Sequence, residues 1–106
     1  MSVTKDGRVA VEGLPEVSAD TPVSVTVGVA SGSVLAQNNN RKGATFVNLS
    51  TNRISFGLGQ AAVLNKGITL MPNGGTWSMD QFTFTTVQIF AIAAGAGSEL
   101  SVQEFD

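Results

Sequence analysis

Valine alternates with small polar residues in the first regular element of the chain. From Val23 to Val29 every second residue is valine, and the residues between them are serine, threonine and glycine. A period of two residues places the valines on one face of a β-strand and the small residues on the other. The pattern therefore predicts a strand over residues 23–29 with one apolar face and one small polar face.

Short alternating or apolar runs continue along the rest of the chain, separated by turn residues. They predict strands at 44–49, 54–58, 68–70, 77–79, 82–84, 87–93 and 100–103. The run 87–93 is apolar at almost every position, which is typical of a central strand covered on both faces. About six to eight short strands predict an all-β fold, either a single small antiparallel β-sandwich or a jelly-roll-like barrel.

The strongest turn signal lies within residues 67–79. Pro72-Asn73-Gly74-Gly75 joins two short alternating runs, and proline fixes φ while asparagine and glycine accept positive φ. We interpret the segment as two strands folded back on one another at the centre of the domain. Trp77 alternates with Met79, so we expect its ring in the core and its indole N–H on a backbone carbonyl. The alternative is an exposed ring that stacks on a sugar.

The first forty residues are predicted to differ from the rest. Residues 1–20 contain one short apolar run, so they form either an edge strand or an arm that becomes ordered on a partner. The polar run 37–43 is interpreted as an exposed loop or linker. We therefore divide the chain into an N-terminal arm or edge strands (1–40) and a compact body (41–106). The candidate partner-binding residues all lie in the first part: Val3, Val9, Val11, Leu14, Val23 and Val25.

Composition excludes most catalytic chemistry. The 106 residues include no histidine and no cysteine, which excludes Ser-His-Asp and Cys-His systems and ordinary zinc sites. The acidic residues lack the spacing of a calcium loop. Gly57-Leu58-Gly59-Gln60 resembles part of a nucleotide loop but lacks its Lys-Ser/Thr, so we interpret these glycines as positions of close backbone approach. We predict no enzyme activity, no cofactor and no metal.

Charge limits the partners. Charged residues make up 13% of the chain, the net charge is −2, and the six basic residues are scattered. Because nucleic-acid binding uses a basic face, we predict no nucleic-acid partner. No run reaches the roughly 18 apolar residues of a membrane helix, and the first residues lack the apolar segment of a signal peptide. We therefore expect no membrane partner and synthesis in a cytoplasm. The low charge suits either a protein packed against partners or a monomer coated with serine, threonine and asparagine.

Several segments of residues 41–106 form a recognisable series. A basic residue precedes an apolar strand that ends in an Asn/Ser turn, a glycine-containing strand follows, and a Pro-x-Gly turn, an aromatic–Ala–Ile strand, a glycine turn and a last strand complete it. The segments are Arg41–Ser50, Ile54–Gly57, Gly67–Gly74, Phe90–Ile92, Gly95–Gly97 and Leu100–Glu104. This series resembles small β-sandwich virion proteins of tailed bacteriophages.

The resemblance implies a head decoration or cementing protein, a head fibre or a spike, without catalytic residues. The expected function is to decorate and stabilise the capsid exterior, on the virion surface after synthesis in the host cytoplasm. The expected partners are the major capsid protein and further copies of this chain, with a trimer favoured. One alternative is a tail or fibre module that binds host-surface glycan through Trp77 and Asn38–Asn40. Another is a head–tail connector component.

Overall fold

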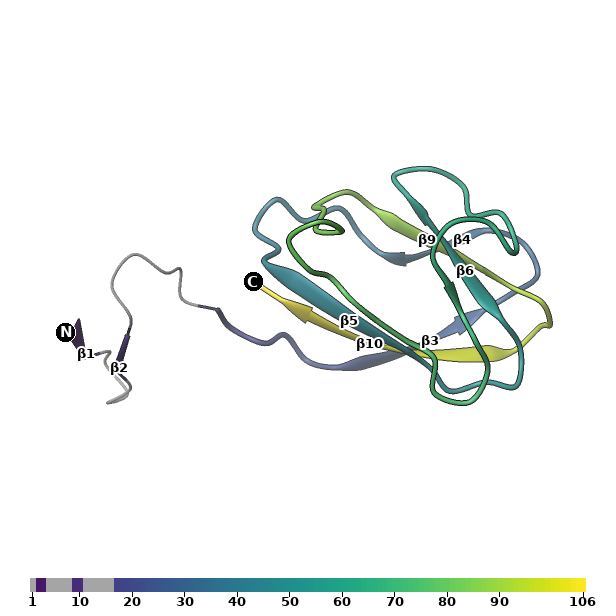
Figure 1. The fold of residues 1–106 in the computed structure, drawn as a ribbon, viewed down its shortest axis with the longest axis horizontal. Coiled ribbons are helices and arrows are strands. Elements are labelled where there is room, and N and C mark those ends of the chain that lie inside the picture. The colour runs from purple at the N-terminus through teal and green to yellow at the C-terminus, as the bar shows by residue number, and fades with distance from the viewer. Residues whose placement is uncertain (1, 4–8, 11–16) are drawn as a thin grey trace.

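The computed structural model describes residues 2–3, 9–10 and 17–106 (Figure 1). Within these residues the chain forms strands and turns, and no helix is long and apolar enough to cross a membrane. The strands are β1 (Ser2–Val3), β2 (Val9–Ala10), β3 (Val23–Val27), β4 (Gly32–Leu35), β5 (Gly43–Asn48), β6 (Ile54–Leu58), β7 (Thr69–Leu70), β8 (Thr76–Ser78), β9 (Ile89–Ala93) and β10 (Ser98–Phe105). β1 and β2 pair with one another, with Val3 opposite Val9.

Strands β3 to β10 form two antiparallel sheets that pack face to face as a β-sandwich (Figure 1). One four-stranded sheet has the order β3-β10-β5-β8 and the other has the order β4-β9-β6-β7. Strands that follow one another in sequence repeatedly lie in opposite sheets, so most ladders join residues far apart in the chain. The predicted all-β antiparallel sandwich is confirmed.

Three aromatic rings lie at the centre of the core. The rings of Phe46 and Trp77 stack with centroids 5.0 Å apart and an interplanar angle of 11°. Phe56, from the opposite sheet, lies tilted against both rings at 5.0 and 5.3 Å. Trp77 is 8% exposed, so its ring is in the core as predicted. Its indole N–H, however, donates to the hydroxyl Oγ1 of Thr83 (3.3 Å) rather than to a backbone carbonyl.

The two strands on either side of the Pro72 turn belong to different sheets, so the predicted hairpin is wrong. β7 pairs with β6, and β8 pairs with β5. The turn chemistry itself is present, because Asn73 and Gly74 have φ values of 60° and 110°. Their backbone N–H groups donate to the carbonyls of Ser50 (2.9 Å) and Asn48 (2.7 Å). The turn is thus bonded to the β5–β6 connection, and the chain crosses here from one sheet to the other.

Residues 79–88 form a loop where a strand was predicted at 82–84. The side-chain Oδ1 of Asp80 accepts hydrogen bonds from the backbone N–H groups of Phe82 (2.8 Å) and Thr83 (3.0 Å). An aspartate that bonds its own downstream backbone offers an alternative to a sheet ladder. The alternation of Phe82 and Phe84 therefore reflects a turn rather than a strand.

The outer face of the second sheet is covered by the connection between β6 and β7. A Cβ atom at Gly57 would lie 2.3 Å from the carbonyl oxygen of Gln60, and the backbone N–H of Asn65 donates to Ser55 Oγ (2.9 Å). Gly57 and Ser55 lie opposite Phe90 and Ile92 of β9, which are half-buried. Close backbone approach is therefore confirmed for Gly57, whereas Gly59 has a φ of 68° and lies near the side chain of Val87. β9 lies inside its sheet as predicted.

Two of the strands before residue 40, β3 and β4, belong to the sandwich. β3 is an edge strand of the first sheet and β4 an edge strand of the second. The predicted strand 23–29 ends at Val27, and Val29 is 63% exposed in the turn that follows. The polar segment 37–42 connects β4 to β5 and is held in place by Asn38, whose backbone N–H donates to the carbonyl of Thr86 (2.9 Å). The compact unit therefore includes edge strands from residue 23 onward and does not begin at residue 41.

Candidate functional site

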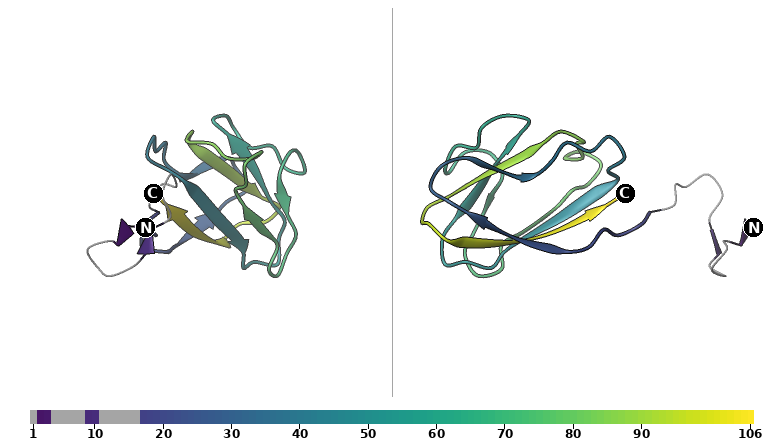
Figure 2. Two further views of the ribbon diagram at one scale, coloured as in Figure 1. Left: turned by 60° about the vertical axis from the view of Figure 1, so that its left-hand side comes forward. Right: turned by 180° about the vertical axis from the view of Figure 1, so that it is seen from behind.

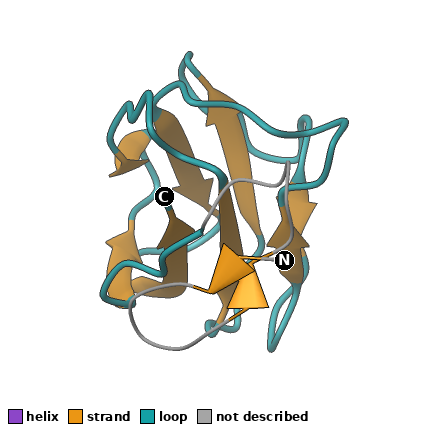
Figure 3. Cartoon of the chain, turned by 90° about the vertical axis from the view of Figure 1, so that its left-hand side faces the viewer, coloured by secondary structure: helices purple, strands orange, loops and turns teal. Residues whose placement is uncertain are grey.

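Residues 18–20 meet the end of the last strand at one end of the sandwich, the end that faces the viewer in Figure 3. The backbone N–H of Ser18 donates to the carbonyl of Asp106 (2.8 Å), and the N–H of Asp106 donates back to the carbonyl of Ser18 (2.9 Å). The N–H of Asp20 donates to the carbonyl of Glu104 (2.9 Å). We call residues 18–20 and 104–106 the N-terminal junction. It holds residues 18–20 against the end of the last strand.

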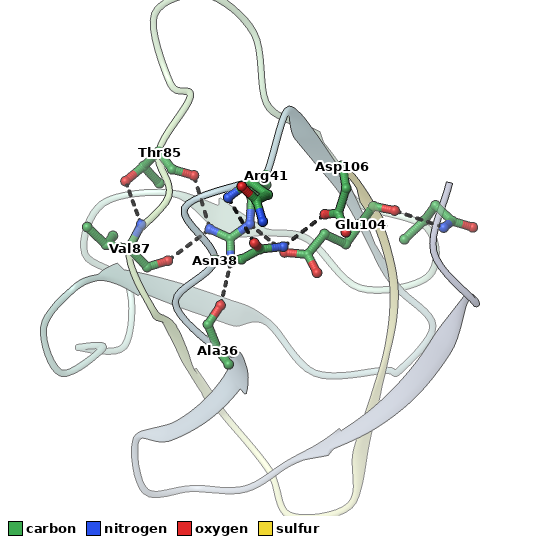
Figure 4. Close-up of polar contacts among 9 residues, drawn as sticks. Ala36, Asn38, Arg41, Thr85, Val87, Glu104 and Asp106 are labelled. Carbon is green, nitrogen blue, oxygen red and sulfur yellow. Dashed lines mark hydrogen bonds and ion pairs between the residues drawn. The ribbon is translucent and has the colours of Figure 1, made fainter. Parts of the chain in front are cut away.

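Arg41 lies beneath this junction and is 2% exposed (Figure 4). Its Nε donates to Glu104 Oε2 (2.7 Å), and Nη1 donates to the carbonyls of Thr85 (3.0 Å) and Val87 (2.9 Å). Nη2 donates to the carbonyl of Ala36 (2.5 Å). A planar guanidinium with several donors suits this task, because it bonds separate segments from one position. Arg41 therefore joins β10 to the loop after β4 and the loop before β9.

Three carboxylates converge at the junction. One oxygen from each of Asp20, Glu104 and Asp106 lies within 4.8 Å of the others. Burial raises the pKa of Asp20, and the charge of Asp106 and hydrogen bonds with Glu104 and Asp106 raise it further. Arg41 balances Glu104, and Asn38 Nδ2 donates to Asp106 Oδ1 (2.8 Å). Glu104 and Asp106 therefore already have protein partners, which gives the cluster a structural role at the junction.

Replacing Asp20 with asparagine is expected to raise the melting temperature at neutral pH. Because the pKa of Asp20 is raised in the folded chain, its contribution to stability is present at low pH and is lost as pH rises through the folded pKa. Asparagine cannot ionise, so Asp20→Asn removes this loss. The gain over the unmodified chain should shrink as pH falls below the ordinary aspartate range. Thermal unfolding at several pH values measures it.

Asp80→Asn is the matched control, for which the opposite change in melting temperature is expected. The backbone N–H groups of Phe82 and Thr83 lower the pKa of Asp80, so the ionised carboxylate stabilises the fold at neutral pH, and this stabilisation is lost as pH falls through its folded pKa. Asp80→Asn should therefore lower the melting temperature at pH 7. If Asp20→Asn also lowered the melting temperature at pH 7, ionised Asp20 would not destabilise the junction, contrary to the raised pKa.

The structure brings together some of the predicted partner-binding residues. Val23 and Val25 lie on β3, where Val23 is 49% exposed and Val25 is half-buried. Val3 and Val9 are paired in the backbone register of β1 and β2. Val11 and Leu14 lie outside the described residues. Partner binding by all six residues stays a prediction.

The alternation at residues 82–84 did not predict that two aromatic side chains are exposed there. Phe82 is 86% exposed and Phe84 is 45% exposed, on the loop that Asp80 and Thr83 hold by hydrogen bonds. The signal for this loop was the spacing of Asp80 and Thr83, which is typical of a side-chain-stabilised turn. Trp77, by contrast, is buried and is not available to stack on a sugar.

No protein-family model matches this chain, and no curated protein matches it. A solved structure described as "Bacillus endospore appendages form a novel family of disulfide-linked pili" is similar to it with a TM-score of 0.46 and 14% sequence identity. The similarity covers 92% of this chain and 91% of that chain.

Proposed function

We propose that this chain is a non-enzymatic structural protein of a tailed-phage particle, which decorates and stabilises the capsid exterior. The segments that carry the resemblance to such proteins include the residues that hold the sandwich together. Arg41 bonds three segments at one end, Asn48 is buried at the turn after β5, and Gly57 lies beneath the β6–β7 connection. The resemblance therefore involves positions with physical roles in this fold, which supports a shared architecture.

The observation that carries the proposal is the N-terminal junction. Backbone hydrogen bonds of Ser18 to Asp106 and of Asp20 to Glu104 on β10 anchor residues 18–20 at one end of the sandwich. A folded body with an anchored segment suits decoration, because the segment binds the major capsid protein while the body adds contact area across neighbouring capsomers. Further copies of this chain are its second partner, and the capsid surface is its location.

Binding to particles that lack this protein tests the proposal. Purified full-length chain should bind such particles in a fixed ratio to the major capsid protein, measured by gel quantitation. A variant without residues 1–16 should bind much less while it keeps its fold, because the junction at residues 18–20 is intact. The buried Trp77 provides a fluorescence check of folding.

The outcomes separate the alternatives. Absence of binding by the full chain would contradict capsid decoration, and binding confined to a few copies at one vertex would favour a connector. Equal binding of the shortened variant would contradict the role of the N-terminal segment. The exposure of Phe82 supports a second candidate, glycan binding by a tail or fibre module. Loss of host-cell binding in Phe82→Ala, with capsid binding intact, would favour that function.

A further inference from the structure

The free edge of β3 differs from the other sheet edges in the described part of the chain. β7 has two residues, β8 has three, and the pairing of β4 with β9 shifts register between Ser33 and Leu35. Short strands and bulges are features that prevent edge strands from pairing with other chains. β3 has five residues and pairs with β10 without a shift of register, along one margin of the sandwich (Figure 2). Its outer edge is therefore the most regular one available for pairing.

This margin of the sandwich is also uncharged. Residues 21–40, which include both β3 and β4, contain no aspartate, glutamate, lysine or arginine. β3 contacts β4, so the two uncharged edges lie on the same side. Natural proteins commonly place charges, lysine above all, on an edge that must stay unpaired. The uncharged side therefore lacks electrostatic protection against another copy of itself.

The part of β10 that pairs with β3, residues 98–102, contains one charge, and that charge is already hydrogen-bonded. Glu99 on β10 accepts hydrogen bonds from Ser24 Oγ and Thr26 Oγ1, each at 2.6 Å, and these bonds lower its pKa. The valines occupy the other face of β3, since Val23 and Val25 lie opposite the buried Val102 and Leu100. A strand added to this edge would therefore meet hydroxyls on one face and valine on the other.

We infer that β3 pairs antiparallel with β3 of a second copy, about a two-fold axis at Val25. The strand reads valine, hydroxyl, valine, hydroxyl, valine in both directions. In this register Val25 faces Val25 of the second copy, Ser24 faces Thr26, and Val23 faces Val27. A two-fold interface requires a surface that complements itself, and this sequence meets that requirement. The two β3-containing sheets then form one continuous sheet across the dimer.

Packing and charge both fit this arrangement. Val23, which is 49% exposed, gains an apolar cross-strand neighbour. Each Glu99 carboxylate is already held by two hydroxyls of its own β3, so it would enter the interface as a hydrogen-bonded group. The inference does not depend on capsid binding and holds for the isolated chain.

Single cysteines test the register directly, because the natural chain has none. Directly opposed residues of an antiparallel pair have Cα atoms about 4.5–5.5 Å apart, which is within reach of a disulfide. Full-length Val25→Cys should therefore form a covalent dimer on mild oxidation. Val23→Cys is the matched control. Its two copies would lie roughly 13 Å apart along the pair, so it should cross-link several-fold more slowly although Val23 is more exposed.

Analytical ultracentrifugation measures the oligomeric state of chains in which Val25 is unchanged and no cysteine has been introduced. The unmodified chain should show a dimer at sub-millimolar concentration. Ser24→Lys with Thr26→Lys should return it to a monomer, since the new charges of one copy face those of the other. Thr76→Lys with Ser78→Lys makes the same change on β8, at the opposite edge of the same sheet, and should leave the dimer intact.

Three results would overturn the inference. One is a monomer at all these concentrations, and another is faster cross-linking of Val23→Cys than of Val25→Cys. The third is a trimer that is lost when residues 1–16 are removed, which would identify the N-terminal segment of a neighbour as the occupant of the β3 edge.

Discussion

Replacing Arg41 with methionine is expected to lower the free energy of unfolding by about 3–5 kcal/mol, the usual loss when one partner of a buried ion pair is removed. The Arg41 side chain is fully buried, and the Glu104 side chain is 15% exposed. Methionine occupies similar space but donates no hydrogen bonds. The variant would leave Glu104 beside two other carboxylates without its cation. It would also leave the carbonyls that Arg41 bonds, at residues 36, 85 and 87, without this donor.

Two further variants define the cause of this loss. Arg41→Lys keeps the positive charge but lacks the planar guanidinium that bonds several segments at once. Its free energy of unfolding should therefore lie between those of Arg41→Met and the unmodified chain. Arg53→Met removes an exposed arginine and should change stability by no more than about 0.5 kcal/mol.

Urea unfolding, followed by the fluorescence of the buried Trp77, measures all the Arg41 and Arg53 variants. If Arg41→Met lost no more stability than Arg53→Met, the buried guanidinium would not hold the junction together.

The main features of the fold follow from local patterns. Period-two alternation predicted the strands at 44–49 and 54–58, and the apolar run predicted β9 as a central strand. The existence of these strands follows from the local pattern, and in β5 the alternation also matches which residues are buried. In β6 both faces are buried, because the β6–β7 connection covers the outer face, and the alternation gave no sign of this. The predicted hairpin across Pro72 is wrong because a local turn signal does not specify strand pairing. Turn chemistry fixes φ and ψ at Asn73 and Gly74, but it does not determine which strands β7 and β8 pair with.

The candidate site was less predictable, because its contacts join distant parts of the chain. In the sequence, Arg41 is a basic residue within the polar run 37–43, just before the predicted strand 44–49. Its acceptors include Glu104, 63 residues away, and the carbonyls of Thr85 and Val87, which have no signature in the sequence. Asn38 similarly looked like part of a solvated run, whereas its side chain bonds Asp106. Local patterns do not reveal acceptors supplied by backbone carbonyls of another segment.

Asn48 is the second residue whose replacement should have a large effect. Its side chain is completely buried at the end of β5. Nδ2 donates to the carbonyls of Asn52 (2.7 Å) and Met71 (3.1 Å), and Oδ1 accepts from the backbone N–H (2.9 Å) and Oγ (2.7 Å) of Ser50. One amide thus joins the β5–β6 connection to the end of β7, which belongs to the opposite sheet.

Asn48→Leu is expected to lower the free energy of unfolding by about 3–5 kcal/mol. Leucine fits an apolar core but leaves several partly buried polar groups without partners, each at a cost of about 1–3 kcal/mol, and such losses add incompletely. Asn48→Asp should also destabilise the fold, because an ionised carboxylate would face the carbonyls of Asn52 and Met71. Its loss should be smaller at acidic pH, where the protonated carboxyl donates one hydrogen bond.

The pH dependence distinguishes the hydrogen bonds of Asn48 from simple packing, and urea unfolding at two pH values measures it. The exposed Asn39 provides the control, because Asn39→Leu makes the same chemical change and should alter stability by no more than about 0.5 kcal/mol. If Asn48→Leu changed stability as little as Asn39→Leu, the carbonyls that Asn48 bonds would have to accept hydrogen bonds from other donors in the variant. If Asn48→Asp were equally unstable at both pH values, its defect would come from shape rather than charge. The expected pattern, with leucine poor throughout and aspartate improving in acid, would identify the donated hydrogen bonds as the link between the two sheets.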